Sequence, residues 1–135
     1  MPLTENRNTP QRSGEIVALS VAANVRIFAG SLVALTAAGL ATPGAVATTL
    51  KGMGRARGEA DNTGGAAGAI KVEVEKGVFR FKNSAAGDAI TAADIGSNAF
   101  IVDDETVAKT SGGDTRSVAG MIFDVDANGV WIKFS

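Results

Sequence analysis

Few residues of this chain could do chemistry, and the most suggestive group lies near its C-terminal end. Asp124, Asp126 and Asn128 precede Gly129 with the spacing D-x-D-x-N-G, which matches the first half of a calcium-binding loop. The twelfth position of such a loop needs a bidentate glutamate, and here it is Ser135. An Asn-Gly pair between two apolar runs instead favours a hairpin turn. We therefore predict a β-hairpin at this position and no metal site.

Two further patterns could belong to active sites. Asp103-Asp104-Glu105 offers neighbouring carboxylates, the groups that glycosidases use, but adjacent acids on a turn are more typical of a solvated surface. The glycine-rich segments 52–58 (GMGRARG) and 64–68 (GGAAG) lack the Gly-Lys-Ser/Thr ending of a phosphate-binding loop. For both segments we predict close backbone packing or a loop, with no cofactor.

The residue types that are missing narrow the function further. The chain has 135 residues and contains no His, no Cys and no Tyr. Without His it lacks the usual general base near neutral pH, and without His and Cys it lacks the ligands of most zinc and transition-metal sites. Asp, Glu, Lys, Ser and Thr remain for catalysis. We therefore predict a protein that is not an enzyme and that carries no cofactor.

Charge and hydropathy indicate whether the protein binds nucleic acid or a membrane. The chain has 13 basic and 14 acidic residues, so its net charge is −1, and the basic residues are scattered. Nucleic-acid binding needs a concentrated positive patch, so we predict none. Residues 27–50 carry no charge, but glycine and Pro43 interrupt them, and we predict no membrane span. The polar first dozen residues do not resemble a signal peptide, which predicts synthesis in the cytoplasm.

The sequence pattern predicts an all-β protein: a small single-domain β-barrel or sandwich of short antiparallel strands, with an extended N-terminal arm. Residues 1–13 form the polar arm and residues 14–135 the β domain. Apolar and charged residues alternate over 70–75 and again over 78–82, which predicts a hairpin, and 118–125 with 130–134 predicts a second. Further short strands are expected at 15–21, 25–28, 31–35, 45–50, 99–102 and 105–108, with one helical turn at 91–94.

Some side chains are candidates for contact with another protein. Residues 1–13 have the composition of an extended arm or a disordered tail, and a functional arm would order only against a neighbouring subunit, because polar termini often fold on contact. Trp131 shares a strand face with Lys133 and is either an interface residue or partly buried within the fold. Arg55 and Arg57 are the tightest basic pair. The predicted contact residues are Leu3, Arg7, Pro10, Arg12, Arg55, Arg57 and Trp131.

The succession of segments along residues 14–134 resembles the family of phage capsid cement, or head decoration, proteins. The resemblance begins with Gly14-Glu15-Ile16-Val17-Ala18-Leu19 and the segment GSLVAL from Gly30. It continues through Gly77-Val78-Phe79, DAITAADIGSNAFIV at 88–102 and Asp103-Asp104-Glu105-Thr106-Val107, and it ends with Arg116-Ser117-Val118-Ala119-Gly120, Asp124 and Gly129-Val130-Trp131-Ile132. No single segment is diagnostic, and the order of segments carries the likeness.

The resemblance implies a structural virion protein on the outer surface of the capsid. Such a protein bridges subunits of the major capsid protein, often with an N-terminal arm, and assembles as a homo-oligomer, most often a trimer, with a dimer also possible. The family has no catalytic residues, and its contact residues form no strict motif that could be transferred here. The alternative is a surface-exposed binding or adhesion module for carbohydrate or a host surface, which would need a row of exposed aromatic residues.

Overall fold

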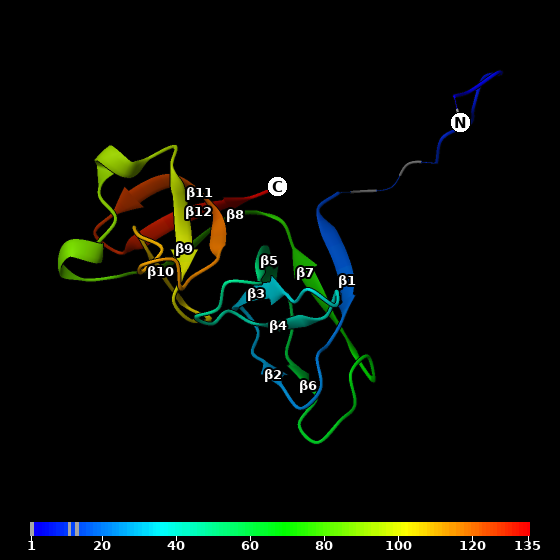
Figure 1. Ribbon diagram of the computed structural model, residues 1–135, viewed down its shortest axis with the longest axis horizontal. Helices are drawn as coiled ribbons and strands as arrows, with labels where there is room; N and C mark the ends of the chain where they lie inside the picture. The colour runs from blue at the N-terminus through cyan, green and yellow to red at the C-terminus, as the bar shows by residue number, and fades with distance from the viewer. Residues whose placement is uncertain (1, 11, 13) are drawn as a thin grey trace.

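Short strands joined by glycine-rich turns build nearly all of the regular structure, and the prediction of an all-β fold is confirmed. The computed structural model describes residues 2–10, 12 and 14–135 (Figure 1). Its strands are β1 (Ile16–Ser20), β2 (Arg26–Ile27), β3 (Leu32–Leu35), β4 (Ala41–Pro43), β5 (Lys51–Ala56), β6 (Ala60–Asp61), β7 (Lys71–Glu75), β8 (Gly77–Asn83), β9 (Asn98–Ile101), β10 (Thr106–Ala108), β11 (Val118–Asp126) and β12 (Gly129–Phe134). Two 3-10 turns, η1 (Ala86–Asp88) and η2 (Ala92–Asp94), complete the set, and η2 lies at the predicted helical turn.

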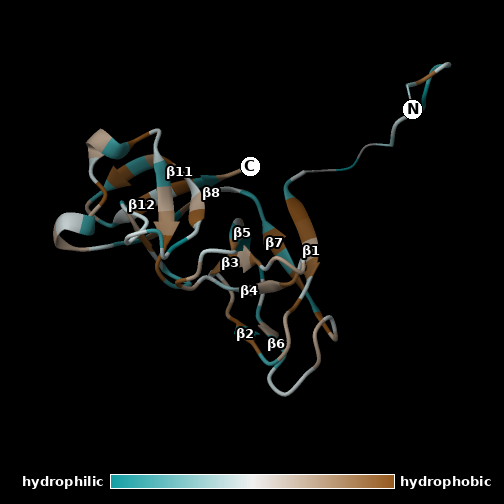
Figure 2. Cartoon of the chain, viewed as in Figure 1, coloured by the Kyte–Doolittle hydropathy of each residue, from teal (hydrophilic) through white to brown (hydrophobic). Residues whose placement is uncertain are grey.

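Five of the strands form one sheet in the order β1-β7-β5-β3-β4, and β2 pairs with β6 beside it. The edge strand β1 is mostly apolar (Figure 2), and it pairs with β7 from Ile16↔Glu75 to Ser20↔Lys71. Just after β1, a parallel bridge joins Val21 to Ala41 of β4, the opposite edge strand. The two edges of this sheet therefore meet at one end.

The other five strands close into a barrel in the order β10-β8-β12-β11-β9. All pairs are antiparallel except β10 with β8, which is parallel. The predicted hairpin of β11 and β12 is confirmed. Val130, Ile132 and Phe134 of β12 point into the barrel and are buried, whereas Lys133 is exposed on the outside. Successive side chains of a strand point to opposite sides, so β12 has one apolar face toward the core and one face toward solvent.

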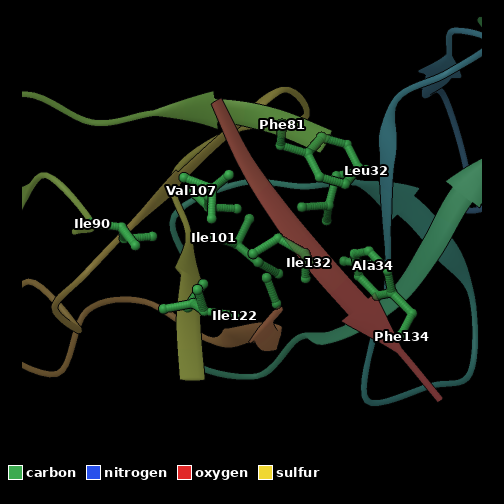
Figure 3. Close-up of a cluster of buried hydrophobic side chains, with 12 residues drawn as sticks. Leu32, Ala34, Phe81, Ile90, Ile101, Val107, Ile122, Ile132 and Phe134 are labelled. Carbon is green, nitrogen blue, oxygen red and sulfur yellow. The ribbon is translucent and has the colours of Figure 1, made fainter. Parts of the chain in front are cut away.

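Strand β3 is shared by the two halves of the molecule, which makes them one domain. Leu32 and Ala34 belong to the barrel core, whereas Val33 on the opposite face belongs to the core of the first sheet. Figure 3 shows Leu32 and Ala34 in the same group of side chains as Ile132 and Phe134. A strand that is buried on both faces needs a continuous apolar run, which explains the sequence LVAL.

The predicted hairpin over 70–82 does not form, and this prediction was wrong. β7 pairs with β1 and β5 in the first sheet, whereas β8 pairs with β12 and β10 in the barrel. Lys76 and Gly77 therefore carry the chain from one sheet to the other, and the backbone N–H of Lys76 donates to the carbonyl of Glu15. The alternating pattern correctly indicated two strands, but alternation does not specify which strand each one pairs with.

The strand expected at 45–50 is also absent, and this prediction was wrong. The strand lies earlier, at Ala41–Pro43, where Pro43 is tolerated because β4 is at the edge of the sheet. The following segment is held by a side chain. Ser117 Oγ donates to the carbonyl of Ala47 at 2.6 Å and accepts the N–H of Leu50 at 3.0 Å. These bonds satisfy backbone groups that would otherwise need a neighbouring strand.

The N-terminal arm stands apart from the body of the molecule. Its described residues contain no helix or strand, are exposed, and extend away from the start of β1 (Figure 1). Leu3 is 70% exposed. In the described ranges, no helix is both long and apolar enough to cross a membrane.

One ion pair anchors the long loop before β11. Arg116 Nη1 donates to Asp88 Oδ2 at 2.8 Å, and Thr110 Oγ1 donates to Asp88 Oδ1 at 2.6 Å. The hydrogen bond from Thr110, and after it the bond from Arg116, hold the pKa of Asp88 below its usual value. A carboxyl group whose folded pKa is lowered stabilises the fold at higher pH, and that stability is lost as the pH falls through the folded pKa.

We expect Asp88→Asn to lower the free energy of unfolding by about 1–2 kcal/mol at pH 7, because Arg116 loses its charged partner. The difference from wild type should begin to shrink as the pH falls below the usual pKa of an aspartate, about 3.9, and should vanish only below the lowered folded pKa, where the wild-type carboxyl group is protonated as well. Urea unfolding at pH 7 and pH 3 measures both values. Asp114→Asn in the same loop is the control, and it should leave stability within about 0.5 kcal/mol. An equal loss at both pH values would contradict this account.

Candidate interaction surface

The structure brings three of the sequence-predicted contact residues to one side of the body. Arg55 and Trp131 line the same hollow, which has a volume of about 560 Å³. Arg57 lines an adjoining hollow together with Arg55. The other four, Leu3, Arg7, Pro10 and Arg12, are exposed on the arm, away from this surface. The predicted residues therefore fall into two groups, one on the body and one on the arm.

Trp131 is placed by the register between the last strand and β8. Its neighbours in sequence, Val130 and Ile132, point inward, so Trp131 faces outward, directly opposite Arg80. The guanidinium of Arg80 lies 5.7 Å from the ring centre of Trp131. The indole Nε1 donates to Asp126 Oδ2 at 2.9 Å, which fixes the ring. The side chain is thus half-buried and held in one orientation, which limits the entropy lost on binding.

Arg55 is placed by β5, where glycine spacing lets the backbone approach β7. A side chain at Gly54 would put its Cβ 2.2 Å from the carbonyl oxygen of Glu75, and Gly54 has a φ of +144°. Close backbone packing was one of the two outcomes predicted for this segment. Arg55 Nη2 donates to Glu75 Oε1 at 2.5 Å, and its guanidinium lies 4.2 Å from the ring centre of Phe79.

These hollows join around one exposed turn. Gly30 lines four adjacent hollows, and its backbone N–H donates to the carbonyl of Ala56 at 2.8 Å, which holds the turn against β5. We call this surface the Gly30 trough. Its lining includes Phe28, Ala29, Gly30, Arg55, Arg57, Glu75, Phe79, Arg80, Lys82, Asp104, Glu105 and Trp131.

The charges in the trough are unevenly distributed. Asp104 and Glu105 lie at the side of Gly30 next to Phe28. Burial, with the neighbouring Asp103 charge second, raises the pKa of Asp104. Lys82 forms an ion pair with Glu105. Arg80 differs from the other basic residues of the trough, because within the described part of the chain it forms no ion pair.

The carboxylate nearest to Trp131 is occupied by the fold itself. Asp126 accepts hydrogen bonds from Trp131 and from the backbone N–H groups of Asn128 and Gly129, at 2.9, 2.8 and 3.1 Å. The bond from Trp131 is the largest of the causes that lower the pKa of Asp126. The half-motif that resembles a calcium loop is thus explained by the hairpin, whose turn Asp126 caps.

A second surface lies on the outside of the barrel, along β11. Met121 and Phe123 are 37% and 53% exposed, and Ile95, just after η2, is 45% exposed. Two backbone hydrogen bonds bring these elements together: Gly96 N–H donates to the carbonyl of Ile122, and Ile122 N–H donates to the carbonyl of Ser97. We call Ile95, Met121 and Phe123 the β11 face. Exposed apolar side chains in a group are characteristic of surfaces that bind another protein.

Sequence reasoning missed several residues of both surfaces. Arg80 and Phe79 were recognised only as parts of a strand, and the β11 face was not singled out. The pairing of β8 with β12, which places Arg80 opposite Trp131, joins segments that are distant in sequence. The one available signal was that Met121 and Phe123 are apolar residues at outward positions of a predicted strand.

The side chains of the trough are suited to binding a ligand. Guanidinium groups beside aromatic rings fit a carboxylate that is flanked by apolar groups. No family model, no curated protein and no solved structure matches this chain.

Proposed function

We propose that this protein binds the outside of a phage head and stabilises it by bridging subunits of the major capsid protein. The order of segments along residues 14–134, which resembles that of capsid cement proteins, supports this proposal. In this role the protein is made in the host cytoplasm and joins the virion as a homo-oligomer, with three copies as the first expectation. Many weak contacts on a symmetric shell add up through multivalency, so each copy needs only a modest surface.

The structural observation that carries the proposal is the β11 face on a closed barrel. Apolar side chains of barrel strands normally point inward, yet Met121 and Phe123 of β11 are exposed, and Ile95 after η2 is exposed as well. In the closed barrel every strand is hydrogen-bonded to a neighbour on each side. The backbone that carries the β11 face is therefore held rigidly even when no other protein is bound. Such a face supplies a rigid apolar contact for a shell whose subunits are fixed in position.

Co-sedimentation with undecorated, expanded phage heads tests the proposal. The purified protein should pellet with the heads to a fixed ratio of copies per capsid subunit, and decorated heads should resist heating better than bare heads. If the protein stays in the supernatant at micromolar concentration, with heads that bind another cement protein, the proposal fails.

We expect Phe123→Asp to weaken head binding at least tenfold, because a charge would replace an apolar side chain at the centre of the contact. Folding should be unaffected, since Phe123 is 53% exposed. The matched control is Val46→Asp, which places the same charge on a residue that is 55% exposed and lies outside the β11 face. Equal binding by the two variants would remove the β11 face from the capsid contact.

A second candidate function is a surface-exposed binding or adhesion module for carbohydrate. The half-buried Trp131 beside Phe79 in an open hollow favours it, because sugars stack on aromatic rings. A glycan array separates the two candidates. Binding that is lost in Trp131→Ala, together with absence of head binding, would favour the adhesion module.

A further inference from the structure

The Gly30 trough has one basic group, Arg80, that forms no ion pair with any described residue. Its charge helps to lower the pKa of Asp126, but the oxygens of Asp126 already accept hydrogen bonds from Trp131, Asn128 and Gly129. Arg55 is paired with Glu75, and Arg57 lies 3.7 Å from Glu73. Arg80 instead lies over Trp131, is exposed, and forms no ion pair with any described residue. A guanidinium that stacks on an indole is already oriented, so its donors remain available to a carboxylate from another molecule.

The acidic residues of the trough lie beside this cation. Glu105 lines one hollow together with Arg80 and Lys82 and a second hollow together with Asp104, and Asp103 adjoins them in sequence. Only Lys82 forms an ion pair with this trio among the residues that the structure describes. The trough therefore carries a cation that forms no ion pair with any described residue and, beside it, surplus negative charge on Asp104 and Glu105.

The N-terminal arm has a complementary pattern. Glu5 is its only acidic residue, and Arg7 and Arg12 follow it. Leu3 lies two positions before Glu5, so in an extended chain the two side chains point to the same side. An apolar group beside a carboxylate is what the aromatic rings and Arg80 are suited to bind. Pro2 and Pro10 favour the extended conformation and reduce the entropy lost on binding.

We propose that the arm of one copy of this chain lies in the Gly30 trough of a second copy, with Glu5 on Arg80 and the arginines of the arm facing Asp104 and Glu105. Leu3 then packs on Trp131 and Phe79. The inference does not depend on capsid binding, which the β11 face would perform.

The dimensions agree with this exchange. Residues 2–14 span up to about 43 Å when extended, at about 3.3 Å per residue. A folded chain of this size has a radius of gyration of about 14 Å, so the arm can reach across a neighbouring body. In the structure the arm extends away from its own body (Figure 1). Because arm and trough are different surfaces, the contact is head-to-tail, and it closes into a ring such as a trimer if the rotation permits.

Charge reversal in the full-length chain tests the exchange. We expect the wild type to associate in sedimentation velocity between 1 and 100 µM, on the order of the affinity of small interfaces. Glu5→Lys and Arg80→Glu should each weaken association at least tenfold. The double variant, which restores an opposite-charge pair, should recover most of the wild-type association. The fluorescence of Trp131, the only tryptophan, should shift over the same concentration range.

The control is Lys133→Glu, which makes the same charge change on the strand of Trp131 but outside the trough. It should associate like wild type. Three results would overturn the inference: a monomer of 13.6 kDa at every concentration, no recovery in the double variant, or a Trp131 shift that does not depend on concentration, which would place the arm in its own trough. A monomer that still binds heads would reject the exchange and leave the proposed function intact.

Discussion

Replacing Gly52 by alanine is expected to lower the free energy of unfolding by about 3 kcal/mol. A Cβ at this position would lie 2.0 Å from the carbonyl oxygen of Ala119, 2.7 Å from its carbonyl carbon and 2.8 Å from its Cα. All three are backbone atoms of β11, so no side chain can rotate away, and β5 and β11 would have to separate. These strands belong to the first sheet and the barrel, respectively. The substitution therefore strains the contact that joins the two halves of the molecule.

The measurement is chemical unfolding, followed by the fluorescence of Trp131. Gly58→Ala is the matched control, because no atom lies within 4 Å of the Cβ it would add and its φ is not positive. It should change stability by no more than about 0.5 kcal/mol. Since a domain of this size is stabilised by only about 5–15 kcal/mol, the difference between the two variants should be plain. Equal stability of the two would mean that the strands do not meet as closely as described.

The second large effect is expected for Leu32→Ala, which should cost about 2–5 kcal/mol. Leu32 is fully buried in the barrel core, although its strand belongs to the first sheet. The substitution leaves a cavity that the neighbours can fill only in part, because β3 is fixed by β4 on one side and β5 on the other.

Leu3→Ala removes the same atoms from a side chain that is 70% exposed, and it should leave stability unchanged within about 0.5 kcal/mol. Because β3 contributes side chains to both cores, the barrel and the first sheet of Leu32→Ala should still unfold together in one transition. The midpoint of that transition should lie at a lower denaturant concentration or temperature than in the wild type. Separate melting of the two halves, seen as a two-step curve in circular dichroism, would contradict the shared role of this strand.

The strand pairings that could be predicted are those between strands that follow one another in the sequence. The hairpin of β11 and β12 follows from two apolar runs and the turn signal between them, and the structure places this turn at Ala127-Asn128, with Asp126 paired to Gly129. The runs at 70–75 and 78–82 look equally favourable, yet each pairs with strands far along the chain. Alternation fixes which residues face the core, and Val72, Val74 and Phe81 are indeed buried. The choice of partner depends on the energy of the whole assembly, which no local pattern contains.

The same limit applies to the interaction surfaces. Trp131 and Arg55 could be selected from their residue types alone, because exposed aromatic residues and arginine are common at interfaces. Arg80 could not be selected in this way, because its place beside Trp131 depends on the pairing of β8 with β12. Gly30 could not be selected either, because only the folded structure brings four hollows together around it. The arm was recognised from its polar composition, but its separation from the body is a matter of three-dimensional structure.

The closure of the strands has a consequence for behaviour in crowded conditions. The barrel has no unpaired edge, and the bridge from Val21 to Ala41 brings together the two edges of the first sheet. Exposed edges are the sites at which β proteins stack into aggregates. Closure of the barrel, together with this bridge, leaves fewer backbone groups free for such stacking than two open sheets of the same strands would. We expect concentrated solutions to stay clear at a net charge of only −1, where most proteins are least soluble.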